Sequence, residues 1–420
     1  MIRPAVVAIS ISMASFASAG PVASPYTSYF AFGDSLSQDD KLPQLAPPSL
    51  DGRFSSGRVW TEYLADVFTA AGKQTANYAL GGATAGSTNT TNYEGFFPAP
   101  RTPVQDAQLA QLQALSTFDG QVQIASATVP DPGTNPLVSV LFGANDIFQQ
   151  LPGVFADAVS TTNVGDIPAR LTTGINTLAN NTVASIVGGI TQLNTNNSAY
   201  DDFLVVNLPD ISSTPAFGPW GIGVATQQLA ALQGSIPPGA TPSPELAAQI
   251  AAAEAQLAFL TFAPSALNPA LPDTLAGAAS LAFNAALEMA IADLDDSLHV
   301  SIFKQDEFLE DFAATSLLNG KNIFEPCTPS FTTDTGISCV YETDPDGNII
   351  GLNPKNAENF FFGDSVHPAG FVQEEFGRRV IASLDAQLPA PVPLPAGLPL
   401  ILLGLGGFAV VAKRKAARQA

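Results

Sequence analysis

The sequence predicts an α/β fold: a doubly wound (flavodoxin-like) parallel sheet with helices on both faces. Short runs rich in Val, Phe and Tyr recur along the 420 residues, and most of them end in Gly, Asn or Pro. Helical patterns lie between these runs, and strands that alternate with helices are typical of parallel sheets. Ligands bind at the carboxyl ends of the strands in such sheets, so we expect the functional site there.

Segments of two kinds make up this alternation. The helical pattern VWTEYLADVFTAAG (59–72) places large apolar side chains on one face and ends at a glycine that suits a helix C-terminus. A second pattern, AASLAFNAALEMAIADLDDS, occupies 278–297. The segments with the composition of buried strands are 28–32, 76–80, 136–142, 202–208 and 299–303.

Residues 219–275 depart from the alternation. They are rich in Ala and Pro, and a helical stretch, ELAAQIAAAEAQLAFL, lies between proline-rich flanks. We interpret them as a helical insertion in a single domain that spans 26–388. The insertion could form a lid over the active site or could be structural padding.

The composition is that of a folded and strongly acidic protein. Hydrophobic residues make up 46% of the chain, which is ample for a packed core, and the net charge is −21. Such a surface repels the phosphates of nucleic acids, so nucleic acid is excluded as a partner. It also disfavours binding to anionic membrane surfaces.

The N-terminus has the pattern of an export signal. One arginine precedes an apolar stretch, and Ala17-Ser18-Ala19 is a small-residue sequence of the kind that signal peptidase cleaves. We therefore interpret residues 1–19 as a signal peptide and exclude them from the fold. An uncleaved membrane anchor is the alternative.

The C-terminus, 389–420, combines a Pro-rich spacer, an apolar helix and a basic tail. Its apolar stretch is only marginally long enough to span a membrane. The pattern VPLPAG, apolar helix, basic end resembles the VPLPA type of exosortase sorting signal. That resemblance implies export in a Gram-negative bacterium to the periplasm, cell surface or medium, transient membrane association, and sorting machinery as a partner. A permanent single-span anchor is the alternative.

The sequence contains two cysteines, Cys327 and Cys339. In an exported protein, two cysteines separated by a short loop indicate a disulfide, which would contribute roughly 3 kcal/mol in the chain-entropy model. A metal site built from the two thiols and the two histidines is conceivable, but the spacing does not suggest it.

A candidate nucleophile follows the first predicted strand: Ser35, in YFAFGDSLS. A serine hydroxyl needs a base to take its proton, and histidine suits that role near neutral pH. His299 opens a predicted strand without special surroundings, so we expect it to be structural or exposed. His367 follows Asp364 by three residues, a spacing that can set a carboxylate against one ring nitrogen while the other faces outward.

Donors for an oxyanion are available at two other predicted strand ends. NYALGGATAG supplies Gly81 and Gly82, whose backbone can approach a ligand closely, and VLFGAND supplies the side-chain amide of Asn145. These residues and Ser35 follow three successive predicted strands, so they are expected at the same edge of the sheet.

Four segments match, in order, the sequence blocks of the GDSL, or SGNH, hydrolase family. They are GDSLS at 33–37, the glycine of ALGGAT, GAND at 143–146 and DSVHPAG at 364–370. The chain resembles this family from about residue 28 to residue 385. The resemblance implies the SGNH-hydrolase architecture and an ester-hydrolysing activity that uses neither a metal nor an organic cofactor.

Carried over block by block, the resemblance makes Ser35 the nucleophile and Asp364 and His367 the rest of a catalytic triad. Asn145, the Ser35 N–H and a glycine N–H would form the oxyanion hole. Gly81 is preferred because the family glycine directly follows the apolar strand end, and Gly82 remains possible. The first block continues as Gln-Asp-Asp, where many relatives have Asp-x-Gly, so the loop beside the nucleophile is unusual.

The expected function is therefore an exported serine ester hydrolase, a lipase or esterase, phospholipases included. Its substrate would be a lipid or an acylated small molecule or polysaccharide. The α/β-hydrolases share the order Ser, Asp, His, but they need a G-x-S-x-G motif, which does not occur in the sequence. The alternatives are a non-catalytic surface or matrix protein on the same scaffold, and a carbohydrate O-acetyl esterase or acyltransferase.

Overall fold

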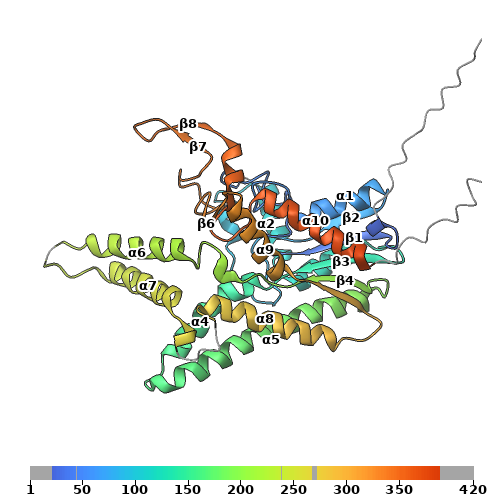
Figure 1. Cartoon of the computed structure of the whole chain (residues 1–420), viewed down its shortest axis with the longest axis horizontal. Coiled ribbons are helices and arrows are strands. Elements are labelled where there is room, and N and C mark those ends of the chain that lie inside the picture. The colour runs from blue at the N-terminus through green and yellow to red at the C-terminus, as the bar shows by residue number, and fades with distance from the viewer. Residues whose placement is uncertain (1–20, 44, 238, 267–271, 388–420) are drawn as a thin grey trace, which may run out of the picture.

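The computed structural model describes residues 21–43, 45–237, 239–266 and 272–387. The predicted signal peptide (1–19) and the predicted sorting signal (389–420) lie outside the described residues. The main sheet has five strands, all parallel, in the order β2-β1-β3-β4-β5 (Figure 1). These strands are β1 (Ser28–Gly33), β2 (Gln74–Asn77), β3 (Pro136–Leu141), β4 (Asp202–Val206) and β5 (His299–Phe303). The predicted α/β fold is confirmed.

The neighbouring strands β1 and β3 are buried along their whole length, which explains why their sequences are almost continuously apolar. After β1 the chain adds β2 on one side of it, and β3 then pairs on the other side. The strand order therefore reverses at β1, and Gly33 at its end lies opposite Leu141 at the end of β3. Such a reversal separates the loops that follow the two strands and makes room for a site between them.

Helices cover both faces of the sheet, and the alternation of side chains along β1 assigns its residues to two cores (Figure 1). Phe30 and Phe32 face one core, and Tyr29 and Ala31 face the other. The first core is completed by α2 (Pro103–Ala114), α3 (Phe118–Thr128), α4 (Ala144–Val159), α5 (Ile167–Asn196) and α8 (Leu275–Ala292). The second is completed by α1 (Trp60–Ala70), α9 (Gln305–Leu318) and α10 (Gly370–Gln387).

The helix α8 is, among the described residues, the one that is long and apolar enough to cross a membrane by length and composition. Its side chains Phe283 and Leu287 are fully buried in the first core, where α8 packs against α5. The core therefore accounts for the buried side of α8, whereas Leu281 and Met289 are exposed.

Two predicted strands end earlier in the structure: β2 ends at Asn77 and begins at Gln74, and β4 ends at Val206. An asparagine side chain lies at each of these ends. At the end of β2, the Asn77 side chain accepts the Ala79 N–H (2.9 Å) and donates to the Ser37 carbonyl (2.8 Å). After β4, the Asn207 side chain accepts the Gln305 N–H (2.6 Å) at the start of α9. Backbone bonds to the neighbouring strands continue past both ends, since the Tyr78 N–H donates to the Ala31 carbonyl (2.7 Å) and the Asn207 N–H to the Phe303 carbonyl (3.1 Å). The two side-chain amides add contacts that fix the loops at the carboxyl edge of the sheet.

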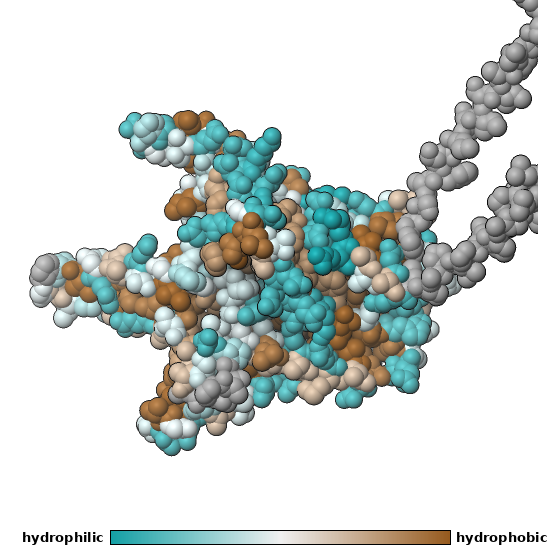
Figure 2. Space-filling model, viewed as in Figure 1, coloured by the Kyte–Doolittle hydropathy of each residue, from teal (hydrophilic) through white to brown (hydrophobic). Residues whose placement is uncertain are grey.

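The segment 219–275 forms a pair of helices where the sequence indicated a single helix between proline-rich flanks. The helices α6 (Pro219–Gly234) and α7 (Pro244–Thr261) pack side by side and project from the body (Figure 1). Each has proline at its first position, where the missing N–H costs nothing. Figure 2 shows hydrophobic residues along this arm, whose base is fixed by aromatic contacts of Phe259 with Phe155 and Phe217.

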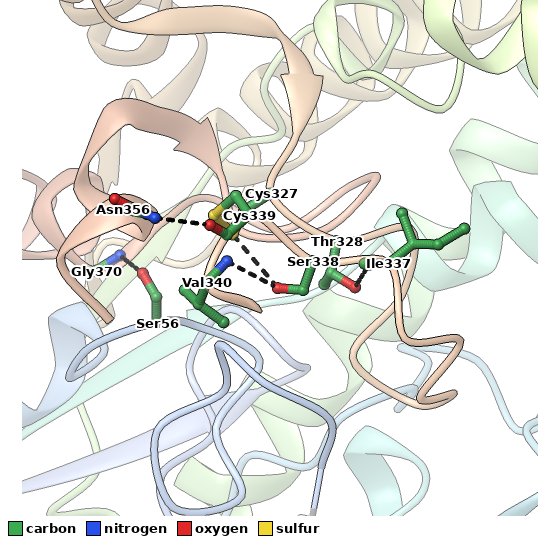
Figure 3. The surroundings of a disulfide bond; sticks show 9 residues. All are labelled: Ser56, Cys327, Thr328, Ile337, Ser338, Cys339, Val340, Asn356 and Gly370. Carbon is green, nitrogen blue, oxygen red and sulfur yellow. Dashed lines mark hydrogen bonds between the residues drawn. A yellow bond between two sulfur atoms is a disulfide. The ribbon is translucent and has the colours of Figure 1, made fainter. Parts of the chain in front are cut away.

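The C-terminal part contains two small sheets and the disulfide. The strand β6 (Asn322–Pro326) pairs with β9 (Phe360–Phe362), and β7 (Tyr341–Thr343) forms a hairpin with β8 (Ile349–Leu352). Cys327 and Cys339 are joined (Figure 3), so the predicted disulfide is confirmed. It closes the loop that follows β6, next to the strand that leads into the Asp364 segment.

The two ends of the described chain lie together. Tyr26 and Gln387 line one surface hollow with Asp202 and His299, which begin β4 and β5. This is the amino end of the parallel strands, opposite the edge at which Ser35 follows β1.

Candidate active site

Ser35 lies in a tight turn directly after the central strand β1. The Asp34 carbonyl accepts the N–H groups of Ser37 (3.1 Å) and Gln38 (3.0 Å), and the Asp34 carboxylate accepts the Leu36 N–H (3.0 Å). These bonds engage the backbone N–H groups of the three residues that follow Ser35. The Ser35 N–H itself donates to none of the described residues. The Ser35 residue is 7% exposed, so the turn holds a nearly buried hydroxyl at the carboxyl edge of the sheet.

His367 and Asp364 complete a continuous hydrogen-bonded chain with this hydroxyl. The His367 Nε2 lies 2.7 Å from the Ser35 Oγ, and the His367 Nδ1 lies 2.8 and 2.9 Å from the two oxygens of Asp364. A carboxylate only accepts, so the Nδ1 carries the proton and the Nε2 presents a lone pair to the serine hydroxyl. The structure thus brings Ser35 to the predicted Asp364–His367 pair, whose histidine lies 332 positions further along the chain.

The Asp364 segment is itself a tight turn. The Asp364 Oδ1 accepts the N–H groups of Val366 (3.0 Å) and His367 (2.8 Å). Burial alone would raise the pKa of Asp364, but the His367 imidazole and these backbone donors hold that pKa below its usual value. Asp364 is therefore ionised at neutral pH and can stabilise a positive charge on His367.

Contacts between the start of α10 and the first part of the chain hold this segment over Ser35. The buried Gln373 side chain accepts the Trp60 N–H (3.2 Å) and donates to the Leu36 carbonyl (3.4 Å). At the start of α10, the Gly370 N–H donates to the Ser56 Oγ (2.9 Å; Figure 3). One glutamine thus connects the helix after His367 to the turn that carries Ser35.

The other histidine lies elsewhere. His299 begins β5 and its side chain is 66% exposed, so it is an exposed residue at the amino end of the strands. With Asp201 and Asp202 it forms the one group of three metal-ligating side chains found within the described part of the chain. That group lies at the opposite end of the sheet from Ser35.

The two candidate glycines differ in what their N–H groups do. The Gly81 N–H donates to the buried Gln38 Oε1 (2.6 Å), so it is already engaged within the fold. Gly82 has a φ of +80°, which glycine adopts readily, and its N–H donates to no residue that the structure describes. Of the two candidate glycines, Gly82 is therefore the one whose N–H stays available, whereas the preferred Gly81 has its N–H engaged. The Asn145 amide lies beside this turn and donates to the Ala83 carbonyl (3.0 Å).

Gln38 explains the unusual continuation of the first block. Besides accepting the Gly81 N–H, its amide donates to the carbonyls of Gly52 (2.7 Å) and Asp39 (3.0 Å). The side chain is fully buried, and these contacts satisfy both of its ends. Gln38 therefore ties the Ser35 turn to two neighbouring loops, a role that its position after the motif did not reveal.

Asp146 performs a similar task next to Asn145. Its carboxylate accepts the N–H groups of Ala85 (2.8 Å) and Gly86 (3.1 Å) in the loop that follows Gly82. Burial raises the pKa of Asp146, and the two backbone donors oppose that rise. The start of α4 thus fixes the glycine loop, and the sequence signal for this was only the adjacency of Asp146 to Asn145.

Two phenylalanines that the sequence analysis missed border the imidazole. The Phe54 ring centroid is 4.8 Å from that of His367, and the Phe331 ring centroid is 6.1 Å away. The Phe331 N–H also donates to the Asp364 Oδ2 (3.3 Å). Both rings shield the His367–Asp364 pair from water, which strengthens the electrostatic interaction between them.

A cavity of about 680 Å³ lies behind the His367 segment. Leu36, Val366 and Pro368 line it, but Ser35 and His367 do not. The cavity therefore adjoins the residues that flank the serine and the imidazole and is not formed by the reacting groups themselves.

Asp34 supplies a pH-dependent contribution to stability. Burial raises the pKa of Asp34 from 3.8 to about 7, because the Leu36 N–H and the His367 imidazole offset desolvation only in part. Between about pH 4 and pH 7 the native state binds a proton that the unfolded chain has released, so the free energy of unfolding falls as pH rises. Asp146, whose pKa is also raised, contributes a fall of the same sign. We predict that Asp34→Asn makes the fall smaller than in the parent chain, measured by urea unfolding at several pH values.

The control for this measurement is Asp296→Asn, which changes an exposed carboxylate and should leave the pH dependence as in the parent chain. An Asp34→Asn variant with the parental slope between pH 4 and pH 7 would show that Asp34 titrates like an ordinary surface aspartate.

A model of a known protein family matches the chain. The family model described as GDSL-like Lipase/Acylhydrolase matches residues 29–289, more than half of the chain. The matched range contains Ser35 and Asn145, and Asp364 and His367 follow it. No curated protein matches the chain. The fold, the glycine loop and the match agree, and the chain belongs to the GDSL-like lipase/acylhydrolase family.

Proposed function

We propose that this chain hydrolyses carboxylic esters through a serine nucleophile. The family supports a lipase- or esterase-type hydrolase, and one observation carries the finer proposal: the hydrogen-bonded chain from the Ser35 Oγ through His367 to Asp364. A serine activated by an imidazole that a buried carboxylate orients is suited to acyl transfer.

The reaction proceeds in two displacement steps. The His367 Nε2 takes the proton of Ser35 as its Oγ attacks the ester carbonyl carbon, and the tetrahedral intermediate expels the alcohol, which receives that proton from the Nε2. Water then attacks the acyl-enzyme, giving its proton to the Nε2, and the Ser35 Oγ leaves as the proton returns to it. The products are one acid and one alcohol, and Asp364 stays ionised throughout.

The oxyanion is held by three donors in this proposal: the N–H groups of Ser35 and Gly82, and the Asn145 amide. The two backbone groups donate to no other described residue, and one of the two amide protons of Asn145 remains after its bond to Ala83. Donors that are already oriented stabilise the developing negative charge without reorganisation.

The setting of the reaction is part of the proposal. We infer export across the inner membrane of a Gram-negative bacterium from the signal-peptide pattern of 1–19, and removal of 389–420 by sorting machinery from its three-part pattern. The disulfide agrees with an oxidising compartment. Mass spectrometry of the mature protein would test this, since a C-terminus that retains residue 420 would contradict removal of the tail.

Ser35→Ala tests the nucleophile. We predict loss of p-nitrophenyl ester turnover by at least about 10⁴-fold with an unchanged circular-dichroism spectrum, because no other group is placed to accept the acyl chain. His299→Ala is the matched control, since it removes the exposed histidine at the far end of the sheet and should leave turnover intact. Parental turnover in Ser35→Ala would refute the proposed mechanism.

Asn145→Ala tests the oxyanion hole. Removal of one donor that acts in the transition state should lower kcat by about 10²–10³-fold and change KM little. The fold of the variant is checked by its thermal unfolding, since the bond to the Ala83 carbonyl is lost as well. A variant that is folded and has parental kcat would exclude Asn145 from the oxyanion hole.

A further inference from the structure

The loop closed by the Cys327–Cys339 disulfide runs beside the segment that carries the triad acid. Its first residues continue β6 along β9: the Cys327 N–H donates to the Phe362 carbonyl (3.1 Å), and the Thr328 N–H donates to the Gly363 carbonyl (3.0 Å). Because Gly363 precedes Asp364, the start of this loop is in register with the residue before the acid.

The two arms of the loop are joined at its neck (Figure 3). The Cys339 N–H donates to the Cys327 carbonyl (2.6 Å), and the Thr328 Oγ1 donates to the Ile337 carbonyl (3.0 Å). Beyond the neck, residues 332–337 are exposed. The disulfide and the few buried residues are therefore what fix the course of the loop.

Phe331 is the residue of this loop that enters the active site. Its side chain is fully buried, its N–H donates to the Asp364 Oδ2 (3.3 Å), and its carbonyl accepts the Ala46 N–H (2.7 Å). The tip of its ring presses against Gly363, where a Cβ would lie 2.6 Å from the Phe331 Cζ. The same ring packs on Phe54, with 6.5 Å between ring centroids.

Phe331 differs from the other donors to the acid. The remaining donors to Asp364 among the described residues are Val366 and His367, which belong to the same turn. The Phe331 N–H is thus the contact that ties the carboxylate to a different part of the chain. A carboxylate held from both sides cannot swing away when the imidazolium forms.

We propose that Phe331 is a positioning residue of the catalytic site, and that the Cys327–Cys339 disulfide keeps it there. The buried ring anchors the loop, the anchored backbone N–H fixes the Asp364 Oδ2, and Asp364 in turn fixes the imidazole against Ser35. The inference rests on the proposed ester hydrolysis. It adds that the rate depends on the oxidation state of a disulfide that takes no part in the chemistry.

Two substitutions of Phe331 test the positioning role with a p-nitrophenyl ester. Phe331→Ala should lower kcat about tenfold and leave KM within about twofold, because substrate binding does not use the ring, and Phe331→Leu should restore part of the rate. Phe68→Ala is the matched control: it removes an equally buried ring, at the other end of the sheet beside Tyr29, so it should lower the melting temperature and keep kcat.

A folded Phe331→Ala variant with parental kcat would overturn the positioning role. So would equal losses of kcat in Phe331→Ala and Phe68→Ala, since loss of stability alone would then account for the effect. Ser35→Ala separates this result from the proposed function: if Ser35→Ala remains active the mechanism fails, whereas an inactive Ser35→Ala beside a fully active Phe331→Ala refutes only the role of Phe331.

The disulfide is tested with the double variant Cys327→Ala/Cys339→Ala and with dithiothreitol. Both should lower kcat, as Phe331→Ala does. Dithiothreitol should have no effect on the double variant. Reoxidation of the reduced parental enzyme should restore its rate. Parental kcat in the double variant would overturn the role of the disulfide, and inhibition of the double variant by dithiothreitol would show that the reductant acts elsewhere.

Discussion

The packing of α10 against the start of α1 is the constraint on which the whole site depends. Ser35 and His367 are held 2.7 Å apart although 332 residues separate them. The hydrogen bond between Ser35 and His367 requires close packing of α10 against the start of α1. Gly57 and Gly370 allow this, since a Cβ at Gly370 would lie 2.6 Å from the Gly57 Cα. Trp60 stacks on Phe376 below them, with 4.9 Å between ring centroids.

Around this contact, buried polar side chains fix one loop to another. Gln373 joins the turn after β1 to α1, Gln38 joins that turn to the glycine loop, and Asp146 joins the glycine loop to α4. Each is nearly inaccessible to water, where an unpaired polar group would cost about 1–3 kcal/mol. The loops can therefore move only at the cost of leaving such groups unpaired, and this gives the site its rigidity.

The sequence was informative for residues whose chemical role can be recognised from a short local pattern. Ser35 and the Asp364–His367 pair lie in short local patterns, and the parallel sheet follows from the alternation of elements, so both could be predicted. Gln38 and Phe331 could not, because their importance lies in hydrogen bonds to loops distant in sequence. The preference for Gly81 over Gly82 could not take this into account, because only the fold shows that Gln38 engages the Gly81 N–H. The helix α6 of the projecting arm was missed because its glycines and weak apolar pattern give little helical periodicity.

The two ends of the described chain, near Tyr26 and Gln387, lie close together at the amino end of the strands, away from Ser35. The ends of the described chain and the Ser35 hydroxyl therefore lie at opposite edges of the sheet. If either end tethered the protein to a surface, the edge of the sheet that carries Ser35 would face away from that surface. In that orientation Ser35 would be accessible to substrates from the surrounding solution and not to components of the surface that holds the protein.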